Sequence, residues 1–423
     1  MFVLYDAIFL LVALFYLPIY ILRNKFHSGF KMRLGYLPAG LLLNRPIWIH
    51  AVSVGEAMTI KGLVQELRKV YPDKKIVIST ITATGNRIAK GIAQSGDFVT
   101  YLPLDLSFIA KRVIHRLNPS LFILVETELW PNLILALHKK KIPIVTVNGR
   151  ISDFSFAGYL SARFFIRPIL RKISLFCVQA QRDKERLIKL GVSGKDIRIT
   201  GNMKFDVCGY LRKEDIDTNL RRRMGLSSQN KLLVVGSTHP GEEDKILSVY
   251  KQLLLEFPSL VLLIAPRHPE RSKEVGALAV RCGFSVIFIS QMPQAELVVS
   301  EKSVFILDTV GKLLSFYSAA DIVFVGGSLV SKGGHNILEP AALGKTVLFG
   351  PHMFNFRDTA ELFLRNNAAV MVDSEEDLLM QLRQLLRNPA RVAEFSERAQ
   401  RLVLTNQGAT LRAIAYLQEF LKE

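Results

Sequence analysis

Short runs of apolar residues alternate along most of the chain with longer segments in which apolar positions recur every three or four residues. The short runs are rich in valine, isoleucine and phenylalanine, which favour buried strands, whereas the longer spacing is typical of amphipathic helices. Strands that alternate with helices predict parallel sheets with helices on both faces. The expected strands are residues 46–52, 76–80, 98–102, 121–125, 144–147, 175–178, 197–200, 231–236, 261–265, 285–289, 304–307, 322–325 and 346–349.

One break in this alternation divides the chain. Polar and charged residues dominate residues 211–230, which we interpret as a linker. The alternation on either side predicts two Rossmann-like domains, residues 23–210 and 231–423, because 423 residues are too many for one ordinary core. Ligands bind beyond the carboxyl ends of strands in such doubly wound sheets. We therefore expect the site in a central cleft where the two sheets face each other.

The first 22 residues form an apolar run that is broken only by Asp6 and Pro18. At 1.5 Å per residue, a helix of this length just spans a hydrocarbon core of roughly 30 Å, so we expect a membrane anchor. Basic residues follow the run, so we expect the remainder of the chain on the cytoplasmic side of the membrane. A helix that lies on the membrane surface and a buried core helix are the alternatives.

The net charge of +18 and a pI near 9.8 indicate anionic partners: nucleic acid, acidic lipid or a phosphorylated substrate. No basic stripe interleaved with aromatic residues is present, so nucleic acid is not expected. The three cysteines lack metal-ligand spacing and are expected to be reduced thiols. Asp215 and Asp217 have the spacing of a metal-binding pair, but they lie in the linker, away from any strand end. We expect a solvated turn and no metal there.

The segment Gly326–Asp358 carries the strongest functional signal. A strand runs into two glycine pairs and then into a short helix that carries Asn336 and Glu339. Glycines let a ligand approach backbone N–H groups, and Asn336 and Glu339, three residues apart, are expected on one helix face. A carboxylate beside a phosphate site suits the ribose hydroxyls of a nucleotide-sugar donor. Tight turns and a carboxylate placed for the helix dipole are the alternative interpretation.

Carboxylates follow two strands of the first domain. Glu56 comes directly after the first strand and can act as a general base, or can stabilise a helix N-terminus. Glu126 and Glu128 follow another strand, where unpaired burial is costly, so we expect them to face a cleft or a cation. Lys204 lies near the end of the domain and can stabilise charge on a leaving phosphate, although a solvated lysine is the alternative.

Two further segments carry cations. Arg267 and His268 follow a strand of the second domain and suit phosphate binding. The basic and apolar segment Arg163–Lys172 is expected either as a core helix with basic ends or as a membrane-facing patch, and the apolar run upstream favours the patch. In the second interpretation, Phe164 and Phe165 contact lipid.

Five motifs occur in the order typical of one family. They are Ala51–Glu56, Glu126–Asn132, Thr200–Asp206, Pro266–Arg271 and Gly333–Pro340. Together with the apolar N-terminus, they resemble the 3-deoxy-D-manno-octulosonic acid (Kdo) transferases of lipopolysaccharide assembly over nearly the whole chain. The resemblance implies a metal-independent GT-B glycosyltransferase that uses CMP-Kdo as donor and a tetraacylated, bisphosphorylated lipid A precursor (lipid IVA) as acceptor.

The resemblance also implies roles for individual residues. Glu56 matches the general base, and Glu126 and Lys204 match positions that stabilise the transition state. The family commonly has an acidic residue where Lys312 stands, so only backbone contacts to the nucleotide are expected there. The positions that match the CMP site are Arg267, His268, Thr309, Val310, Gly311, Asn336, Ile337, Leu338 and Glu339.

Two other classes of protein fit parts of the pattern. Another membrane-associated GT-B transferase or a sugar-nucleotide epimerase would use a similar donor fold, and Glu339 alone does not distinguish them. The Glu126–Asn132 motif and the apolar N-terminus favour the Kdo transferase. A membrane-tethered nucleic-acid-binding protein would explain the positive charge, but the sequence shows no recognisable nucleic-acid-binding fold.

Overall fold

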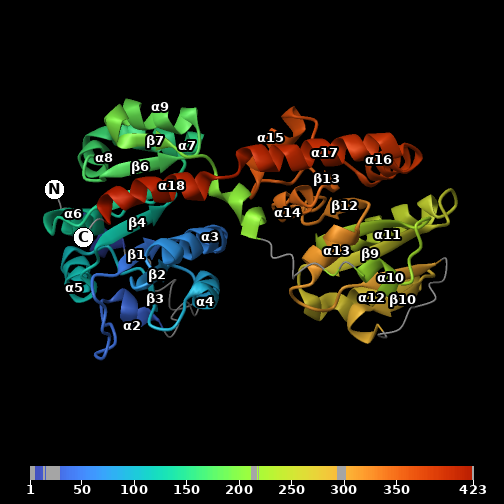
Figure 1. Cartoon of the computed structure of the whole chain (residues 1–423), viewed down its shortest axis with the longest axis horizontal. Coiled ribbons are helices and arrows are strands. Elements are labelled where there is room, and N and C mark those ends of the chain that lie inside the picture. Colours follow the sequence, from blue (N-terminus) through green and yellow to red (C-terminus); the bar gives the residue numbers. More distant parts are fainter. Residues whose placement is uncertain are drawn as a thin grey trace. The chain divides into compact units, whose positions relative to one another are not determined.

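A computed structural model describes residues 5–12, 15, 29–210, 217, 219–292 and 302–421 (Figure 1). The chain divides into two units, the first made of residues 1–210 and 406–423 and the second of residues 211–405. Each unit is built on its own sheet of seven parallel strands. The prediction of two parallel α/β sheets is confirmed, and every expected strand is present with ends shifted by no more than two residues.

The sheet of the first unit has the strand order β3-β2-β1-β4-β5-β6-β7. Its strands are β1 (Ile47–His50), β2 (Ile76–Thr80), β3 (Phe98–Tyr101), β4 (Leu121–Val125), β5 (Ile144–Gly149), β6 (Leu175–Val178) and β7 (Ile197–Ile199). The helices of this unit are α2 (Phe30–Arg33), α3 (Val54–Val70), α4 (Ala83–Ile92), α5 (Ser107–Leu117), α6 (Pro131–Lys139), α7 (Asp153–Ser161), α8 (Arg163–Leu170), α9 (Gln181–Leu190) and α18 (Ala409–Leu417).

Both faces of this sheet are covered, because successive side chains of a strand point to opposite sides. In β1, Ile47 and Ile49 pack into a core with α3 and α18. Trp48, between them, packs into a second core with α5, α6, α8 and α9. Burial on both faces explains why these strands are continuous apolar runs rather than alternating ones.

The second domain does not continue to residue 423 as predicted. Helix α18 belongs to the first unit, where it lies beside α3 (Figure 1). The carboxylate of Asp206 accepts hydrogen bonds from Gly408 N and Thr410 N at 2.6 and 2.5 Å. The guanidinium of Arg412 donates to the carbonyl of Thr200 at 2.8 Å. The apolar face of α18 therefore completes the core of the first unit, which a local pattern cannot show.

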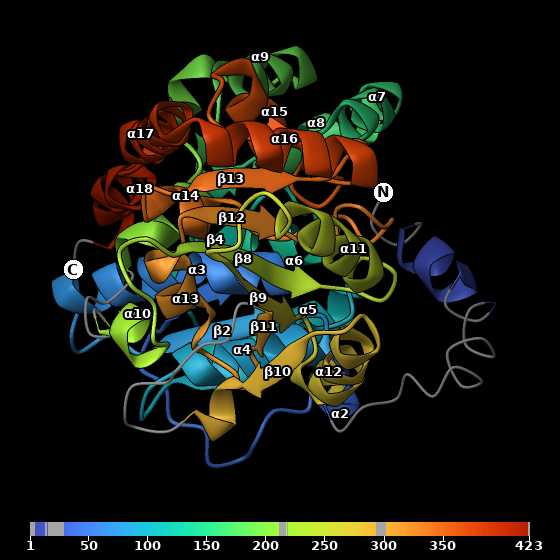
Figure 2. The same cartoon turned by 90° about the vertical axis from the view of Figure 1, so that its right-hand side faces the viewer.

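The sheet of the second unit has the order β10-β11-β9-β8-β12-β13-β14, and most of it can be followed from bottom to top in Figure 2. Its strands are β8 (Lys231–Thr238), β9 (Leu260–Pro266), β10 (Ser285–Phe288), β11 (Ser303–Ile306), β12 (Ile322–Val325), β13 (Thr346–Phe349) and β14 (Val370–Met371). The two-residue β14 was too short to be predicted. The helices are α10 (Leu220–Arg223), α11 (Glu243–Leu253), α12 (Ser272–Arg281), α13 (Leu313–Ala319), α14 (Leu338–Ala342), α15 (Arg357–Arg365), α16 (Glu375–Arg387) and α17 (Pro389–Asn406).

Part of the predicted linker belongs to the second unit. The short helix α10 packs there, with Leu220 buried and the guanidinium of Arg221 bonded to Asp321 and to the carbonyl of Ala319, both at 2.9 Å. Residues 220–230 therefore belong to the second unit rather than to a linker, because Leu220 and Arg221 both contact that unit. Of the two linker aspartates, Asp215 lies outside the described residues, and Asp217 pairs with Arg223 at 2.7 Å.

The predicted membrane anchor falls largely outside the described residues, which include only residues 5–12 and 15 of the first 22. Residues 5–12 are helical and contact the first unit: the ring of Tyr5 stacks on Phe165 with centroids 6.0 Å apart, and Asp6 accepts from Asn132 at 2.6 Å. Among the described parts of the chain, none of the helices has both the length and the hydrophobicity that a bilayer span requires.

Candidate functional site

Each sheet has one position where the strand order reverses. In the first unit the chain moves outward from β1 through β2 and β3 and then returns to β4 on the other side of β1. In the second unit the reversal lies between β8 and β12. Loops that leave the sheet at such a position diverge and leave a crevice for ligands.

Glu56 lies at the reversal of the first unit, in the first turn of α3. Ser53 caps this helix: its hydroxyl accepts from Glu56 N at 3.3 Å and donates to Glu56 Oε1 at 2.9 Å. Glu56 Oε2 accepts from Val52 N at 2.8 Å. Only 7% of the residue is exposed, and this burial, with the negative charges of Glu126 and Glu128, raises the pKa of Glu56 to about 7. A carboxyl group with this pKa is poised to exchange a proton at neutral pH.

Glu126 and Lys204 lie in the same region as Glu56. Glu126 follows β4 with a φ of 59°, a left-handed conformation that is strained for a residue with a side chain. The Nζ atom of Lys204 is 3.7 Å from Glu126 Oε1, and each side chain is 27% exposed. The side chain of Asn148 accepts from Met203 N at 2.9 Å and so positions the turn that carries Lys204. The first unit thus combines a buried carboxyl group with a half-exposed ion pair.

His50 and Trp130 were not predicted to be functional, whereas Glu128, like Glu126, was expected to face a cleft or a cation. Burial and the charge of Glu126 raise the pKa of Glu128. Burial lowers the pKa of His50, at the end of β1, to about 4, so its ring is neutral. Among the described residues, neither His50 Nε2 nor the indole nitrogen of Trp130 has a hydrogen-bond partner, although both are buried. Such groups mark a place that a bound polar molecule would complete. A histidine inside an apolar strand was the available signal.

The second unit brings together residues from three adjacent strands, β9, β8 and β12. Arg267 and His268 follow β9 and are exposed. The positive charge of Arg267 acts on Glu339, where it opposes the rise in pKa that burial causes. Glu339 in turn accepts from the side-chain amide of Asn336 at 3.2 Å. A cation and a carboxylate with an amide therefore share this edge of the sheet, which is the combination expected for a phosphate and a ribose.

The glycine loop after β12 differs from its prediction. The N–H groups of Gly327, Ser328 and Leu329 are not available to a ligand, because all three donate to the carboxylate of Glu242, at 2.7, 3.0 and 2.9 Å. A fourth bond, from His239 N, reaches the same carboxylate at 3.0 Å. Glu242 is fully buried and burial raises its pKa. The first glycine pair therefore serves packing, and an internal carboxylate occupies its donors.

The helix that was expected to carry Asn336 begins only at Leu338. Asn336 precedes it and accepts from Leu338 N at 3.1 Å, so the predicted common helix face was wrong, although Asn336 and Glu339 are in contact. Ile337 and Leu338 are 0% and 1% exposed. Any contact that these two residues make with a nucleotide must therefore come from their backbone.

The remaining predicted segment, Thr309–Gly311, lies between β11 and α13, which packs against α14. Val310 is 84% exposed, and Gly311 has a φ of 86° that favours glycine. The hydroxyl of Thr309 is buried without a hydrogen-bond partner in the described structure. Lys312 is exposed at the start of α13. Backbone groups and one unpaired hydroxyl are thus what this turn offers.

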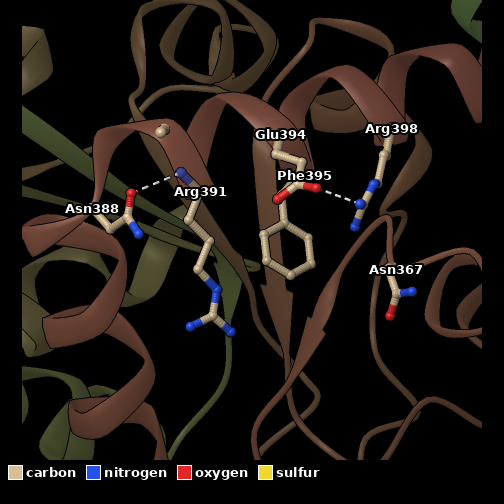
Figure 3. Close-up of a pocket in the computed structure, with 7 residues that line it drawn as sticks. Asn367, Asn388, Arg391, Glu394, Phe395 and Arg398 are labelled. Atoms are coloured by element: carbon tan, nitrogen blue, oxygen red, sulfur yellow. Dashed lines mark hydrogen bonds and ion pairs between the residues drawn. The ribbon is translucent and has the colours of Figure 1, made fainter.

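A separate pocket of the second unit lies along α17 (Figure 3). Its cations already have partners, since Arg398 pairs with Glu394 and Arg391 donates to Gln384 at 2.7 Å. None of the predicted site residues lines it, so we assign it no part in the chemistry.

Solved structures share the fold of this chain. A structure of MurG from Acinetobacter baumannii is similar with a TM-score of 0.55 and 15% identity, over 89% of this chain and 100% of that one. A UDP-GlcNAc 2-epimerase from Neisseria meningitidis, bound to UDP-GlcNAc, is similar with a TM-score of 0.59 and 14% identity, over 88% and 100% of the two chains. At these identities the likeness shows a GT-B-like fold and no particular activity.

Sequence similarity gives the family. Residues 28–207 match the family model described as 3-deoxy-D-manno-octulosonic-acid transferase. The 3-deoxy-D-manno-octulosonic acid transferase of Haemophilus influenzae is 35% identical over 380 residues, which is 89% of this chain and 87% of that protein. The chain belongs to the 3-deoxy-D-manno-octulosonic acid transferase family and is a glycosyltransferase. The resemblance predicted from the five motifs is confirmed.

Proposed function

We propose that this protein transfers Kdo from CMP-Kdo to the lipid A precursor lipid IVA in lipopolysaccharide assembly. Membership of the family supports Kdo transfer. The observation that carries the mechanism is the buried carboxyl group of Glu56, with a pKa near 7, at the strand-order reversal of the first sheet. Within a glycosyltransferase, such a group is suited to take a proton from a hydroxyl nucleophile.

In the proposed reaction, Glu56 accepts the proton of the acceptor hydroxyl while the oxygen of that hydroxyl bonds to the anomeric carbon of Kdo. The bond from that carbon to the phosphate oxygen breaks, and CMP leaves with the electron pair. A carboxylate stabilises the positive charge that develops on the sugar ring. We propose that Glu126, which lies beside Glu56, supplies this carboxylate. We propose that Lys204, whose Nζ is 3.7 Å from Glu126, neutralises charge on the departing phosphate.

The second unit is proposed to hold the donor. Arg267 is exposed, and its fork of donors suits a phosphate. Glu339 suits the ribose hydroxyls, with Asn336 holding its carboxylate in place. The base and ribose are proposed to contact the backbone of Ile337 and Leu338 and the turn Thr309–Gly311. His268, also exposed, adds a further donor at the same edge.

Cations on the chain would make this chemistry independent of metal. Lys204 in the first unit and Arg267 in the second each supply a positive charge where a phosphate group would bind or leave. Because side-chain cations can stabilise a leaving phosphate, we propose that no metal cofactor is required.

The acceptor is an acylated and phosphorylated lipid, so we propose that the protein works at the cytoplasmic face of the inner membrane, with residues 1–22 as its anchor. Helix α8 supports a membrane contact: Phe164 is 91% exposed, and Arg163, Arg167 and Arg171 line the same surface. Phe165 differs from its prediction, since it is partly buried and stacks on Tyr5. One aromatic side chain of this pair, rather than both, is therefore available to lipid.

The test is whether CMP release depends on the lipid acceptor. Purified protein is incubated with CMP-Kdo, with and without lipid IVA, and free CMP is measured. We expect release only with the acceptor. An epimerase, the second candidate because of its shared fold, would convert a UDP-sugar without any acceptor, and that result would replace our proposal.

A further inference from the structure

Two histidines of the second unit, for which no role was predicted, form a hydrogen-bonded pair. His239 follows β8, and His335 lies in the loop after β12, so they meet at the strand-order reversal of this sheet. Their Nε2 atoms are 2.9 Å apart, and the ring planes differ by 2°. A side chain on Gly327 would come within 3.1 Å of His335 Nε2 and within 3.3 Å of the His239 ring. Glycine at this position lets the two rings approach.

The short distance determines how protons are shared. Two neutral imidazoles can form this bond only if one Nε2 carries hydrogen and the other offers its lone pair. The first ring then has an unprotonated Nδ1, and the second ring carries its hydrogen on Nδ1. One additional proton converts the first ring into an imidazolium, after which both Nδ1 atoms are donors. The pair can therefore change from neutral to singly charged without losing its internal hydrogen bond.

The surroundings of the pair are rich in positive charge. Burial is the main cause that lowers the pKa of His239 and brings that of His335 to about 4, and the basic groups of Arg267, His268 and Lys332 lower one or both further. Arg267 and Lys332 form no ion pair with any described residue. His268 contacts His239 edge-on, with centroids 6.1 Å apart.

Acidic groups nearby are already engaged. Glu242 next to His239 receives four backbone N–H bonds, and Glu339 accepts from Asn336. Glu243 and Glu274 pair with Arg271 at 2.9 and 3.1 Å, while Glu270 lies 3.7 Å from His268. The histidine pair therefore faces unpaired cations and lacks an anion of its own. An oxyanion that binds here would supply the missing negative charge.

We propose that His239 and His335 bind the phosphate group of the donor nucleotide as a pair and take up one proton from solvent when it arrives. The inference deepens the proposed function, on which it rests. The proton adds to the free Nδ1 of the pair, so that both rings donate to phosphate oxygens. The same positive charge would stabilise the phosphate as the glycosidic bond breaks and CMP departs.

Isothermal titration calorimetry of the full chain with CMP tests this inference. Titrations near pH 7.5, where a phosphate monoester is a dianion because its second pKa is about 6, are run in buffers of different ionisation enthalpy. We expect uptake of about one proton per CMP bound. Affinity should fall with rising pH, at most about tenfold per unit, because a bound proton must be supplied. Cytidine, which lacks the phosphate, should bind without proton uptake.

Two variants and one control separate this role from a structural one. His335→Gln and His239→Gln should each weaken CMP binding about tenfold and abolish proton uptake, while cytidine binding is retained and shows that the unit is folded. His115→Gln, at an exposed histidine on α5 of the other unit, should behave like the wild type. If the wild type binds CMP without proton uptake, or if both variants bind as it does, the histidine proposal fails alone. If the wild type does not bind CMP at all, the donor proposal fails with it.

Discussion

The strand-order reversals of the two sheets have the same topology and opposite chemistry. At the first, Glu56, Glu126 and Glu128 gather, and Lys204 pairs with Glu126. At the second, the paired imidazoles of His239 and His335 lie beside the cations of Arg267 and Lys332. The fold fixes where a ligand can bind, whereas the loops decide whether the place removes a proton or holds an anion. A division of labour between base and donor site follows from this difference.

The two buried carboxylates, Glu56 and Glu242, sharpen the same contrast. Burial raises the pKa of both. Glu242 receives four backbone N–H groups and is enclosed, so its charge holds a loop. Glu56 receives one N–H and one hydroxyl and lies beside two other carboxylates. A raised pKa therefore marks a reactive group only when the carboxylate still has capacity for another proton partner.

The largest effect is expected at the base. Glu56→Gln should lower the rate of Kdo transfer by about 10²–10⁴-fold, because an amide cannot accept the proton of the acceptor hydroxyl. CMP affinity should not change, since the nucleotide is assigned to the other unit. Steady-state transfer rates and calorimetry with CMP check the two expectations separately. Glu66→Gln, which breaks only an exposed ion pair with Lys69 on the same helix, is the matched control. Full activity in Glu56→Gln would exclude a proton-accepting role.

The next effect concerns stability rather than rate. Glu242→Gln should destabilise the second unit by about 3 kcal/mol, because an amide cannot accept all four N–H bonds that the carboxylate receives. Glu394→Gln, which removes an exposed ion pair with Arg398, should cost less than about 0.5 kcal/mol. Urea denaturation followed by fluorescence compares them. Equal midpoints would show that the loop does not depend on Glu242.

At the donor site, Arg267→Ala should weaken CMP binding by about 10–100-fold, since it removes charge-assisted bonds to phosphate. Arg281→Ala, on the exposed part of α12, serves as the control. Calorimetry with CMP and cytidine distinguishes loss of phosphate contacts from general damage: cytidine binding should survive. Parallel losses for both ligands would contradict the phosphate assignment.

A smaller difference is expected between neighbouring phenylalanines of α8. Phe164→Ser should reduce binding to vesicles that contain anionic lipid several-fold, because the side chain is 91% exposed among arginines. Phe165→Ser should mainly lower thermal stability, since Phe165 packs on the core and on Tyr5. Vesicle sedimentation and thermal melts measure the two. The same vesicle binding for both variants would remove α8 from the membrane contact.

The smallest effect is a shift in pH dependence. Glu56 must be ionised to accept a proton, so kcat/KM should rise through about pH 7, where its pKa lies. Removing the negative charge of Glu126 in Glu126→Gln makes ionisation of Glu56 easier, which lowers the pKa and moves the acidic limb to lower pH. The shift should be a fraction of a unit, because burial is the larger cause. Profiles from about pH 5 to about pH 9 measure it. A shift of the acidic limb to higher pH would contradict the proposed effect of Glu126 on the pKa of Glu56.

Local pattern was enough to predict the strands and the position of Glu56 directly after one of them. Apolar runs mark buried strands, and Ser53 followed three residues later by Glu56 is a helix-start signature that places the carboxylate at a strand end. The features that were missed join distant parts of the chain. His239 and His335 are 96 residues apart, and Glu242 bonds to Gly327 over 85 residues. Such contacts depend on β8 and β12 becoming neighbours, which local spacing does not determine. The return of α18 to the first unit was missed for the same reason.

Mass spectrometry of the reaction product tests the central proposal most directly. Purified protein is incubated with CMP-Kdo and lipid IVA, and the lipid is then analysed. We expect its mass to rise by one or more Kdo residues in the wild type and to stay unchanged with Glu56→Gln. An unmodified lipid in the wild-type reaction, with a sugar nucleotide altered instead, would contradict the assignment of Kdo transfer.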